Sequence, residues 1–571
     1  MINKDSFQSR LRIVSWCVFL FACILVLKLF FVQIIHKSSY TERADRQYAT
    51  PVGDIFERGT IFFSKKDSDL VAGATVMTGF KVAIKPKDIV DAESVYNKLI
   101  TFIPELSHDV FIAKSTKKLD PYEEIANHLT KESADGISAL NIPGVSIYKE
   151  KWRFYPGGSL ASHVLGFVAY KGNDRIGQYG LEKYYNKILS KPADQAYVNF
   201  FAEVFSDIGK NFSDEREGDI VTTIDPNTED MLEGELKKTL AQWNADQMGG
   251  IIMDPKTGEI VAMSGIPDFD LNESGKVKDV KTYTDINVEN VFEFGSVIKP
   301  LVMAGAIDAH VITPETTYLD KGFVIVNKKQ INNFDKKGRG ITTMQGVLNE
   351  SLNTGMVFVE NKLGHDKFRA YMKSYGIGEK TGIDLPNETS GLIKNLESPR
   401  DIEYANAAFG QGIALTPVEA IRAFSAIANG GSLVVPHVVK QIRYSDGTSK
   451  DISYPFTRTN IISKEAAETT TRMLVHVFDY AYGEGKYKFD HYSVATKTGT
   501  AQVAREDGKG YYEDRHMHSF FGYFPAYDPK FIVFLYLKNP KQIKYAAQTL
   551  IPPFVEITKF LTNYYNIPPD R

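Results

Sequence analysis

The longest apolar run of the chain lies close to its N-terminus. Residues 13–35 are hydrophobic apart from Ser15, Lys28 and Gln33, and these 23 residues are enough for one helix across a bilayer. A cleaved signal peptide would have a shorter apolar core and a small-residue cleavage site, which this segment lacks. Residues 1–12 carry three basic side chains against one acid. The pattern therefore predicts a cytoplasmic tail followed by an uncleaved anchor helix.

Hydrophobic patterning divides the remaining chain near residues 215–220. Residues 36–215 mix short strand-like runs, such as KVAIKP and GVSIYKE, with polar helices. The run DIVTTID then predicts a strand that leads through Pro226 into a helix beginning near Thr228. We expect residues 36–215 and 216–571 to form separate domains.

Strand-forming runs recur at distant points of residues 216–571. Two runs flank the turn DPKTG at 254–258 and predict a hairpin. Near the C-terminus, HSFFGYFP and KFIVFLYLKNP predict a second pair of strands, and 546–565 predict a closing helix. A sheet built from sequence-distant strands with helices between them indicates an α/β or α+β layered domain.

Composition and charge narrow the class of protein. The 571 residues are 43% hydrophobic, enough for the cores of about two to four domains. With 67 Lys and Arg against 70 Asp and Glu, the net charge is -3, so no nucleic-acid partner is expected. Both cysteines, Cys17 and Cys23, lie in the predicted anchor. The rest of the chain can therefore form no disulfide and no cysteine-ligated metal site.

A serine three residues before a lysine occurs three times. The pairs that begin at Ser115 and Ser146 stand in charged or strand-like surroundings. The third pair, Ser296 and Lys299, precedes Pro300, which a helix accommodates only in its first turn. Residues three apart share a helical face, so the amine can reach the hydroxyl and, if buried and neutral, take its proton. The alternative is a helix cap beside an exposed lysine.

Two further motifs follow that pair. The pattern S-x-N occurs once, at Ser351 and Asn353. The pattern K-T-G occurs three times, but only the copy at Lys497 follows a strand-like run and has a second threonine, Thr500, with small neighbours. Such neighbours let the backbone lie close to a ligand. The other two copies are interpreted as ordinary turns.

In this order the three motifs resemble the signature of penicillin-binding proteins and serine β-lactamases. The blocks AAFGQGIALTPVEAIRAF and YGIGEKTGIDLPNETSG resemble the transpeptidase domain of class B penicillin-binding proteins, and RFYPGGSLASHVLGFVAY and ERGTIF resemble its pedestal. The resemblance implies an α/β (α+β) transpeptidase domain at 216–571, with an antiparallel sheet flanked by helices. It also implies an α+β pedestal of the dimerisation type at 36–215 and a single transmembrane helix.

The resemblance also implies an activity. The protein would be a D,D-transpeptidase that cross-links peptidoglycan stem peptides ending in D-Ala-D-Ala. Ser296 would attack the carbonyl between the two D-alanines with Lys299 as base, and β-lactams would acylate the same serine. Ser351 and Lys497 would relay protons to the leaving amine. Asn353 would orient the substrate amide.

The K-T-G strand would bind the other end of the donor. By resemblance, Thr498 and Thr500 hold the terminal carboxylate, and Gly499 leaves room for it. Backbone N–H groups of Ser296 and Thr500 would form the oxyanion hole. An amine from a neighbouring stem peptide would then attack the ester. No metal or cofactor is expected.

Two positions depart from the family pattern. Phe294 stands where proline is usual and could reshape the helix entry, and with it the acylation rate or the affinity for β-lactams. Thr496 stands before the K-T-G lysine, where glycine is frequent. Septal members of the family also lack that glycine in some cases.

The likeness of SPRDIEYANAAFGQG and VATKTGTA to septal sequences favours a role in cell division. We then expect a single-pass protein of the bacterial inner (cytoplasmic) membrane, with its bulk outside. Its expected partners are a polytopic glycosyltransferase and other division proteins. The alternatives are an elongation-type transpeptidase, a β-lactamase or carboxypeptidase on the same fold, and a non-catalytic scaffold or β-lactam sensor.

Overall fold

The computed structural model describes residues 16, 57–171, 174–190, 216–482, 485–505 and 510–571. None of the helices in these segments is both long and apolar enough to cross a bilayer. Apart from residue 16, the predicted anchor at 13–35 lies outside the described residues, as do the tail at 1–12 and both cysteines.

Two compact units account for the described chain. The small unit contains Met77–Trp152, and the large unit contains Arg58–Val76 and the described residues from Arg153 onward. Residues 58–76 and 153–190 precede the expected boundary near 215 but belong to the large unit. In the sequence they flank the segment that forms the small unit. The exact domain boundaries remain predictions.

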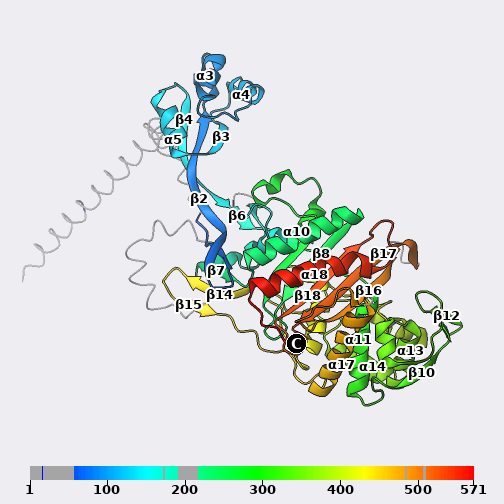
Figure 1. Ribbon diagram of the computed structural model, residues 1–571. Helices are drawn as coiled ribbons and strands as arrows, with labels where there is room; N and C mark the ends of the chain where they lie inside the picture. The colour runs from blue at the N-terminus through cyan, green and yellow to red at the C-terminus, as the bar shows by residue number, and fades with distance from the viewer. Residues whose placement is uncertain (1–15, 17–56, 172–173, 191–215, 483–484, 506–509) are drawn as a thin grey trace, which may run out of the picture. The chain divides into compact units, whose positions relative to one another are not determined.

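The small unit pairs the second half of strand β2 with β3 and β4 and covers them with three short helices (Figure 1). The strands predicted for KVAIKP and GVSIYKE are confirmed as parts of β2 and β4. Its core includes Val82, Leu99 and Phe111, all fully buried. The elements are β2 Leu70–Ile84, α3 Ala92–Leu99, α4 His108–Ser115, β3 Glu123–Leu129, α5 Lys131–Ala139 and β4 Val145–Phe154.

A five-stranded antiparallel sheet forms the centre of the large unit, in the order β16-β17-β18-β8-β9. The predicted hairpin around DPKTG is confirmed as β8 and β9, and the predicted C-terminal strand pair as β17 and β18. The strands are β8 Gln247–Met253, β9 Ile260–Ile266, β16 Ala495–Ala504, β17 Tyr511–Phe524 and β18 Phe531–Lys538.

Helices cover both faces of this sheet, as Figure 1 shows. Helices α10 (Pro226–Trp243) and α18 (Ala546–Tyr564) lie together on one face, and α18 confirms the predicted closing helix. Helix α10 begins two residues before the expected start, because the Asp225 carboxylate accepts hydrogen bonds from the backbone N–H groups of residues 227 and 228. Helices α16 (Pro417–Ala428) and α17 (Lys464–His476) belong to the other face, where α16 contacts β8 and β18 and α17 contacts β16.

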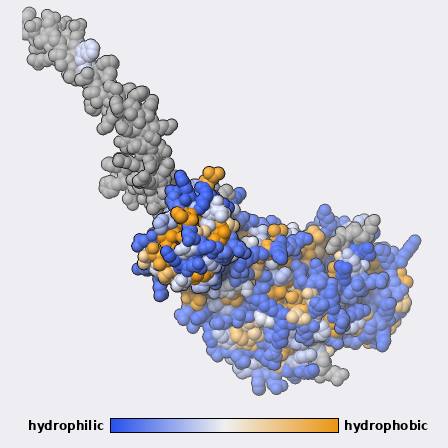
Figure 2. Space-filling model, turned by 90° about the horizontal axis from the view of Figure 1, so that it is seen from above, coloured by the Kyte–Doolittle hydropathy of each residue, from blue (hydrophilic) through white to orange (hydrophobic). Residues whose placement is uncertain are grey.

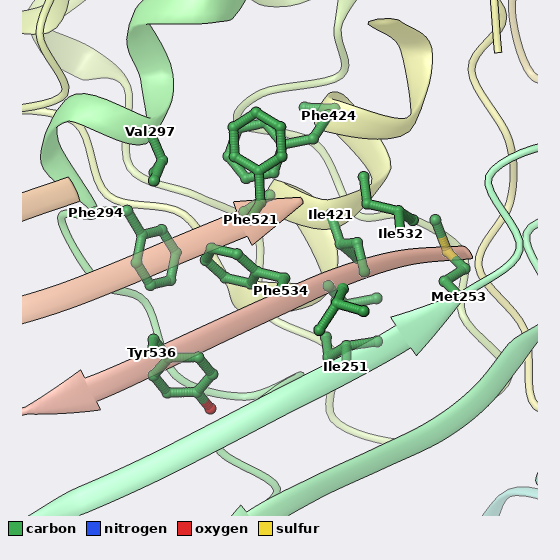
Figure 3. Close-up of a cluster of buried hydrophobic side chains, with 14 of the residues drawn as sticks. Ile251, Met253, Phe294, Val297, Ile421, Phe424, Phe521, Ile532, Phe534 and Tyr536 are labelled. Carbon is green, nitrogen blue, oxygen red and sulfur yellow. The ribbon is translucent and has the colours of Figure 1, made fainter. Parts of the chain in front are cut away.

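The core between the sheet and α16 is rich in aromatic side chains (Figure 3). Phe424 stacks on Phe521 with ring centroids 4.2 Å apart, and Phe294 meets Phe534 edge to face at 4.9 Å. All four rings are buried. Outside this core, hydrophilic residues dominate the face of the large unit that Figure 2 displays.

Two smaller groups of elements complete the large unit. A second sheet contains β1 (Ile61–Ser64), the first half of β2, β7 (Gly218–Thr222), β14 (Val439–Tyr444) and β15 (Ser449–Asp451). The second group consists of two strand pairs and four helices. The strand pairs are β10 Thr317–Asp320 with β13 Gly340–Thr343, and β11 Phe323–Val326 with β12 Lys329–Asn332. The helices are α11 Lys299–Asp308, α12 Met344–Asn349, α13 Asn353–Leu363 and α14 His365–Ser374.

Candidate active site

Ser296 lies in a short 3-10 turn, η6 (Gly295–Ile298), which leads directly into α11. The expected helical start is therefore present, but its first turn is 3-10, and Pro300 occupies the first turn of the α-helix proper. Ser296 is partly exposed. Within the described chain, no hydrogen bond involves its hydroxyl, so this oxygen is accessible to an incoming group.

Lys299 is fully buried one helical turn further on. Its amine donates to the Ser351 carbonyl at 2.6 Å and to Asn353 Oδ1 at 2.9 Å, and it lies 3.2 Å from Ser351 Oγ. No hydrogen bond links it to Ser296. The lysine is thus held by the S-x-N motif, which the sequence places about 50 residues away.

The hydroxyl of Ser351 stands between two amines. Lys497 Nζ donates to it at 3.1 Å, opposite the Lys299 contact, and also to the Thr498 carbonyl at 2.9 Å. Ser351 has φ 53°, a conformation that costs a non-glycine residue energy. This backbone presents both the carbonyl and the hydroxyl of Ser351 to Lys299.

Burial changes the protonation of both lysines. Desolvation, and then the charge of Lys497, hold the pKa of Lys299 well below its ordinary value. Desolvation also lowers the pKa of Lys497 to about 7. Both lysines therefore lose a proton more readily than ordinary surface lysines do.

The edge strand β16 packs closely against η6 because two glycines leave space. A β-carbon on Gly499 would lie 2.3 Å from the Phe294 carbonyl oxygen and 2.3 Å from Ser519 Oγ. Gly295 has φ 66°, and a β-carbon there would lie 2.9 Å from the Thr500 carbonyl oxygen. The backbones of Ser296 and Thr500 are thereby brought side by side.

Three residues that support the site were not identified from the sequence. Ser519 on β17 is buried and donates to the Phe294 carbonyl at 2.6 Å. The Tyr482 hydroxyl accepts from the backbone N–H of Thr498 at 2.9 Å and donates to its Oγ1 at 3.2 Å. The Gly410 carbonyl, in the AAFGQG block, accepts from Gly295 N–H at 3.1 Å. All three act through backbone contacts that only the folded chain defines.

The two departures from the family pattern have structural counterparts. Phe294 fills the aromatic core shown in Figure 3, where its ring contacts Phe534 and Tyr536. Thr496 is buried opposite Gly522 in the β16–β17 register, and the missing side chain at Gly522 leaves space for the Thr496 methyl group. Both larger side chains are therefore buried within the fold.

The remaining copies of the short motifs lie apart from this site. Lys256 is in the turn between β8 and β9 and forms an ion pair with Asp528. Lys380 is an exposed loop residue. The serine-lysine pairs at 115 and 146 belong to the small unit.

An antiparallel sheet, a partly exposed serine and a buried lysine one helical turn after it are the arrangement expected of a serine acyl-transfer enzyme. Matches to family models assign the chain to a narrower class of protein. Residues 248–556 match the penicillin-binding protein transpeptidase domain, and residues 57–202 match the penicillin-binding protein dimerisation domain. The chain belongs to the penicillin-binding protein transpeptidase family, and the class B assignment made from its motifs is confirmed.

Curated relatives cover most of the chain. Stage V sporulation protein D of Bacillus subtilis is 31% identical over 538 residues, which cover 92% of this chain and 81% of that protein. Peptidoglycan D,D-transpeptidase FtsI of Escherichia coli K12 is 26% identical, covering 78% and 73%. Peptidoglycan D,D-transpeptidase MrdA of Acinetobacter baumannii is 27% identical, covering 97% and 88%.

Solved structures share the fold. Penicillin-binding protein 2X from Streptococcus thermophilus matches with a TM-score of 0.71 at 21% identity, covering 90% of this chain and 80% of that one. Penicillin-binding protein 3 from Mycobacterium tuberculosis, complexed with aztreonam, matches with a TM-score of 0.68 at 21% identity, covering 90% and 98%. The predicted transpeptidase fold is confirmed.

Proposed function

We propose that this protein is a peptidoglycan D,D-transpeptidase in which Ser296 forms the acyl-enzyme. One observation carries the assignment of residues: two buried lysines share the hydroxyl of Ser351, and one of them, Lys299, follows Ser296 by one helical turn. A serine needs a neighbouring base to become a nucleophile, and a lysine serves only when it is neutral. Burial and the second cation favour that neutral state of Lys299.

Acylation begins when Lys299 takes the proton of Ser296 Oγ. The oxygen then bonds to the carbonyl carbon between the two D-alanines, and a tetrahedral intermediate forms. When the C–N bond breaks, the leaving amine of D-alanine receives a proton through Ser351. The Ser351 hydroxyl can accept a proton from one lysine while it donates its own, because both amines lie within 3.2 Å.

The K-T-G strand holds the donor. The N–H groups of Ser296 and Thr500 stabilise the oxyanion, and the side-by-side placement of η6 and β16 supports this role. Thr498 and Thr500 bind the terminal carboxylate of the donor, and Gly499 keeps the strand open to it. Asn353 holds Lys299 through Oδ1 and orients the substrate amide.

The second half of the reaction transfers the acyl group. An amine from a neighbouring stem peptide attacks the ester carbonyl, its proton passes to the lysine pair, and Ser296 recovers its hydrogen as the new amide forms. β-Lactams acylate Ser296 by the first half of the same route, opening their ring instead of releasing an amine.

Intact-mass spectrometry after mixing the full-length protein with a penicillin tests this proposal. A stable adduct of the drug's mass on the unchanged protein, absent in Ser296→Ala, is the expected result. Hydrolysed drug without an adduct would instead identify a β-lactamase. Intact drug without an adduct would leave a non-catalytic scaffold and overturn the proposal.

Residues 13–35 are proposed as a single anchor in the bacterial cytoplasmic membrane, with both units outside. The likeness of SPRDIEYANAAFGQG and VATKTGTA to septal sequences supports a role in septal cell-wall synthesis rather than in elongation. A polytopic glycosyltransferase and other division proteins are then its expected partners. A fluorescent fusion should gather at the division site, whereas an even distribution along the side wall would indicate elongation.

A further inference from the structure

A strongly basic segment lies beside the site. Residues 317–343, which form β10 to β13 and their turns, carry six cationic and two acidic side chains, a net charge of +4 in a chain whose overall charge is -3. The proposed reaction assigns no role to any of these charges. Basic patches of this kind attract anionic ligands and raise their association rates.

Three of the lysines gather at one end of the β11–β12 hairpin. Lys321 precedes the hairpin, and Lys336 and Lys337 follow it, with all three exposed. The two chain segments touch, because a β-carbon on Gly322 would lie 2.6 Å from the carbonyl carbon of Lys337, and one on Gly338 would lie 2.8 Å from that of Lys321. We call Lys321, Lys336 and Lys337 the lysine cluster.

No carboxylate of the segment neutralises the cluster. Asp320 is 2% exposed, and its oxygens accept hydrogen bonds from Asn333 Nδ2, Thr354 Oγ1 and the backbone N–H groups of residues 322 and 339. Asp335 pairs with Arg339 at 2.9 Å. Throughout the part of the chain that the structure describes, none of the three clustered lysines forms an ion pair.

The hairpin is fixed to the S-x-N side of the site. Asn353 Nδ2 donates to the Asn332 carbonyl at 3.0 Å. Thr354, the next residue, donates from Oγ1 to Asp320 at 2.8 Å and from its backbone N–H to Asn333 Oδ1 at 3.2 Å. The lysine cluster is therefore held at a set position relative to Asn353 rather than on a free loop.

The same turn also reaches the K-T-G side. The Phe334 ring meets the Tyr545 ring edge to face at 5.7 Å. The next residue, Ala546, donates its N–H to Thr500 Oγ1 at 3.2 Å. Residues 333–337 thus contact elements of both walls of the site, and two lysines of the cluster, Lys336 and Lys337, belong to this turn.

We propose that the lysine cluster docks the carboxylates of the acceptor stem peptide. This inference rests on the proposed function, which already assigns the donor carboxylate to Thr498 and Thr500. The acceptor carries carboxylates of its own but must deliver a neutral amine to the ester. Fixing its carboxylates at Lys321, Lys336 and Lys337 orients it while leaving the amine free to react.

The test uses the full-length protein with all three lysines replaced, Lys321→Gln, Lys336→Gln and Lys337→Gln. A matched control replaces three other exposed lysines that form no ion pair among the described residues, Lys278→Gln, Lys281→Gln and Lys367→Gln. Both variants lose three positive charges, so any difference between them comes from position rather than net charge.

Two reactions are measured on each variant. Acylation by a penicillin needs no acceptor and should stay unchanged in both. Transfer from an acyl-D-alanyl thioester is measured to an N-acetylated peptide that carries a lysine side-chain amine and ends in D-alanine, either as the free carboxylate or as the amide.

For the cluster variant, we expect KM for the carboxylate acceptor to rise about tenfold at low salt, the size of effect that steering by a charged surface produces. KM for the amide acceptor should not change, the salt dependence should flatten, and the control should match the unchanged protein. Equal KM values in all three proteins, with acylation intact, would overturn the inference and mark the cluster as a solvated surface. Absence of acylation in the unchanged protein would overturn the proposed function itself, and this inference with it.

Discussion

Gly499→Ala is the sharpest single change that the structure allows at this site. The new β-carbon would lie 2.3 Å from the Phe294 carbonyl oxygen and from Ser519 Oγ, whereas ordinary contact begins at 3.4 Å. The hydroxyl of Ser519 can rotate, but the carbonyl of Phe294 is backbone. Strand β16 and turn η6 must therefore separate by roughly 1 Å, the difference between the two distances.

A shift of that size moves the two proposed oxyanion donors, the N–H groups of Ser296 and Thr500, apart. Misplacement by about 1 Å costs about 100-fold in rate, or about 2.7 kcal/mol in activation free energy. We expect the second-order rate constant for acylation by a fluorescent penicillin to fall by this factor in Gly499→Ala. The double variant Gly499→Ala with Ser519→Ala removes one of the two close contacts and should stay slow, because the contact with Phe294 remains.

Gly234→Ala is the matched control. A β-carbon there meets nothing within 4 Å, and the residue lies inside α10. Its acylation rate should equal that of the unchanged protein, with a gain of about 0.5 to 1 kcal/mol in the free energy of unfolding. If the acylation rate of Gly499→Ala were within threefold of that of the unchanged protein, close packing of β16 on η6 would not determine the geometry of the site.

Four further outcomes follow from the same geometry. The acylation rate should fall as pH rises through about 7, because burial lowers the pKa of Lys497 to about 7 and the charged form of Lys497 helps to keep Lys299 neutral; a flat profile from pH 5 to 9 would contradict this. Between pH 7 and about 9 the unfolded chain binds more protons than the folded one at Lys497, so urea unfolding should show stability increasing with pH. Lys497→Met should slow acylation by more than 100-fold without lowering Tm, since it removes a buried charge; a large drop in Tm would show that the lysine is needed for folding. Phe294→Ala should cost about 3 to 5 kcal/mol of unfolding free energy, measured against Phe456→Ala, whose half-exposed ring should cost under about 0.5 kcal/mol.

Much of the site could be predicted because its chemistry is concentrated in short motifs. Ser296, Ser351 and Lys497 lie far apart in the sequence, yet each motif keeps its residues at fixed local spacing, and the structure brings all three motifs together. The strands could also be predicted, because aromatic and β-branched runs between clear turns are local signals in the sequence.

The partners of these motifs could not be predicted, because they depend on tertiary register. The contact from Ser519 to the Phe294 carbonyl exists only because Ser519 faces Gly499 across β16 and β17. Tyr482 contacts Thr498 through a hydroxyl that no local pattern distinguishes from other tyrosines. The direction of the Lys299 amine, toward Ser351 rather than Ser296, likewise depends on where α13 begins.

The most direct test of acyl transfer through Ser296 is a single product analysis. The full-length protein is incubated with an acyl-D-alanyl thioester and an acceptor amine. The products are separated, and their masses are measured by mass spectrometry and compared with those of the products formed by Ser296→Ala. We predict a new amide between donor and acceptor, an acyl adduct mapped to Ser296 during turnover, and neither species in the variant. An amide formed at the normal rate by Ser296→Ala, or release of the free acid alone by the unchanged protein, would contradict the account.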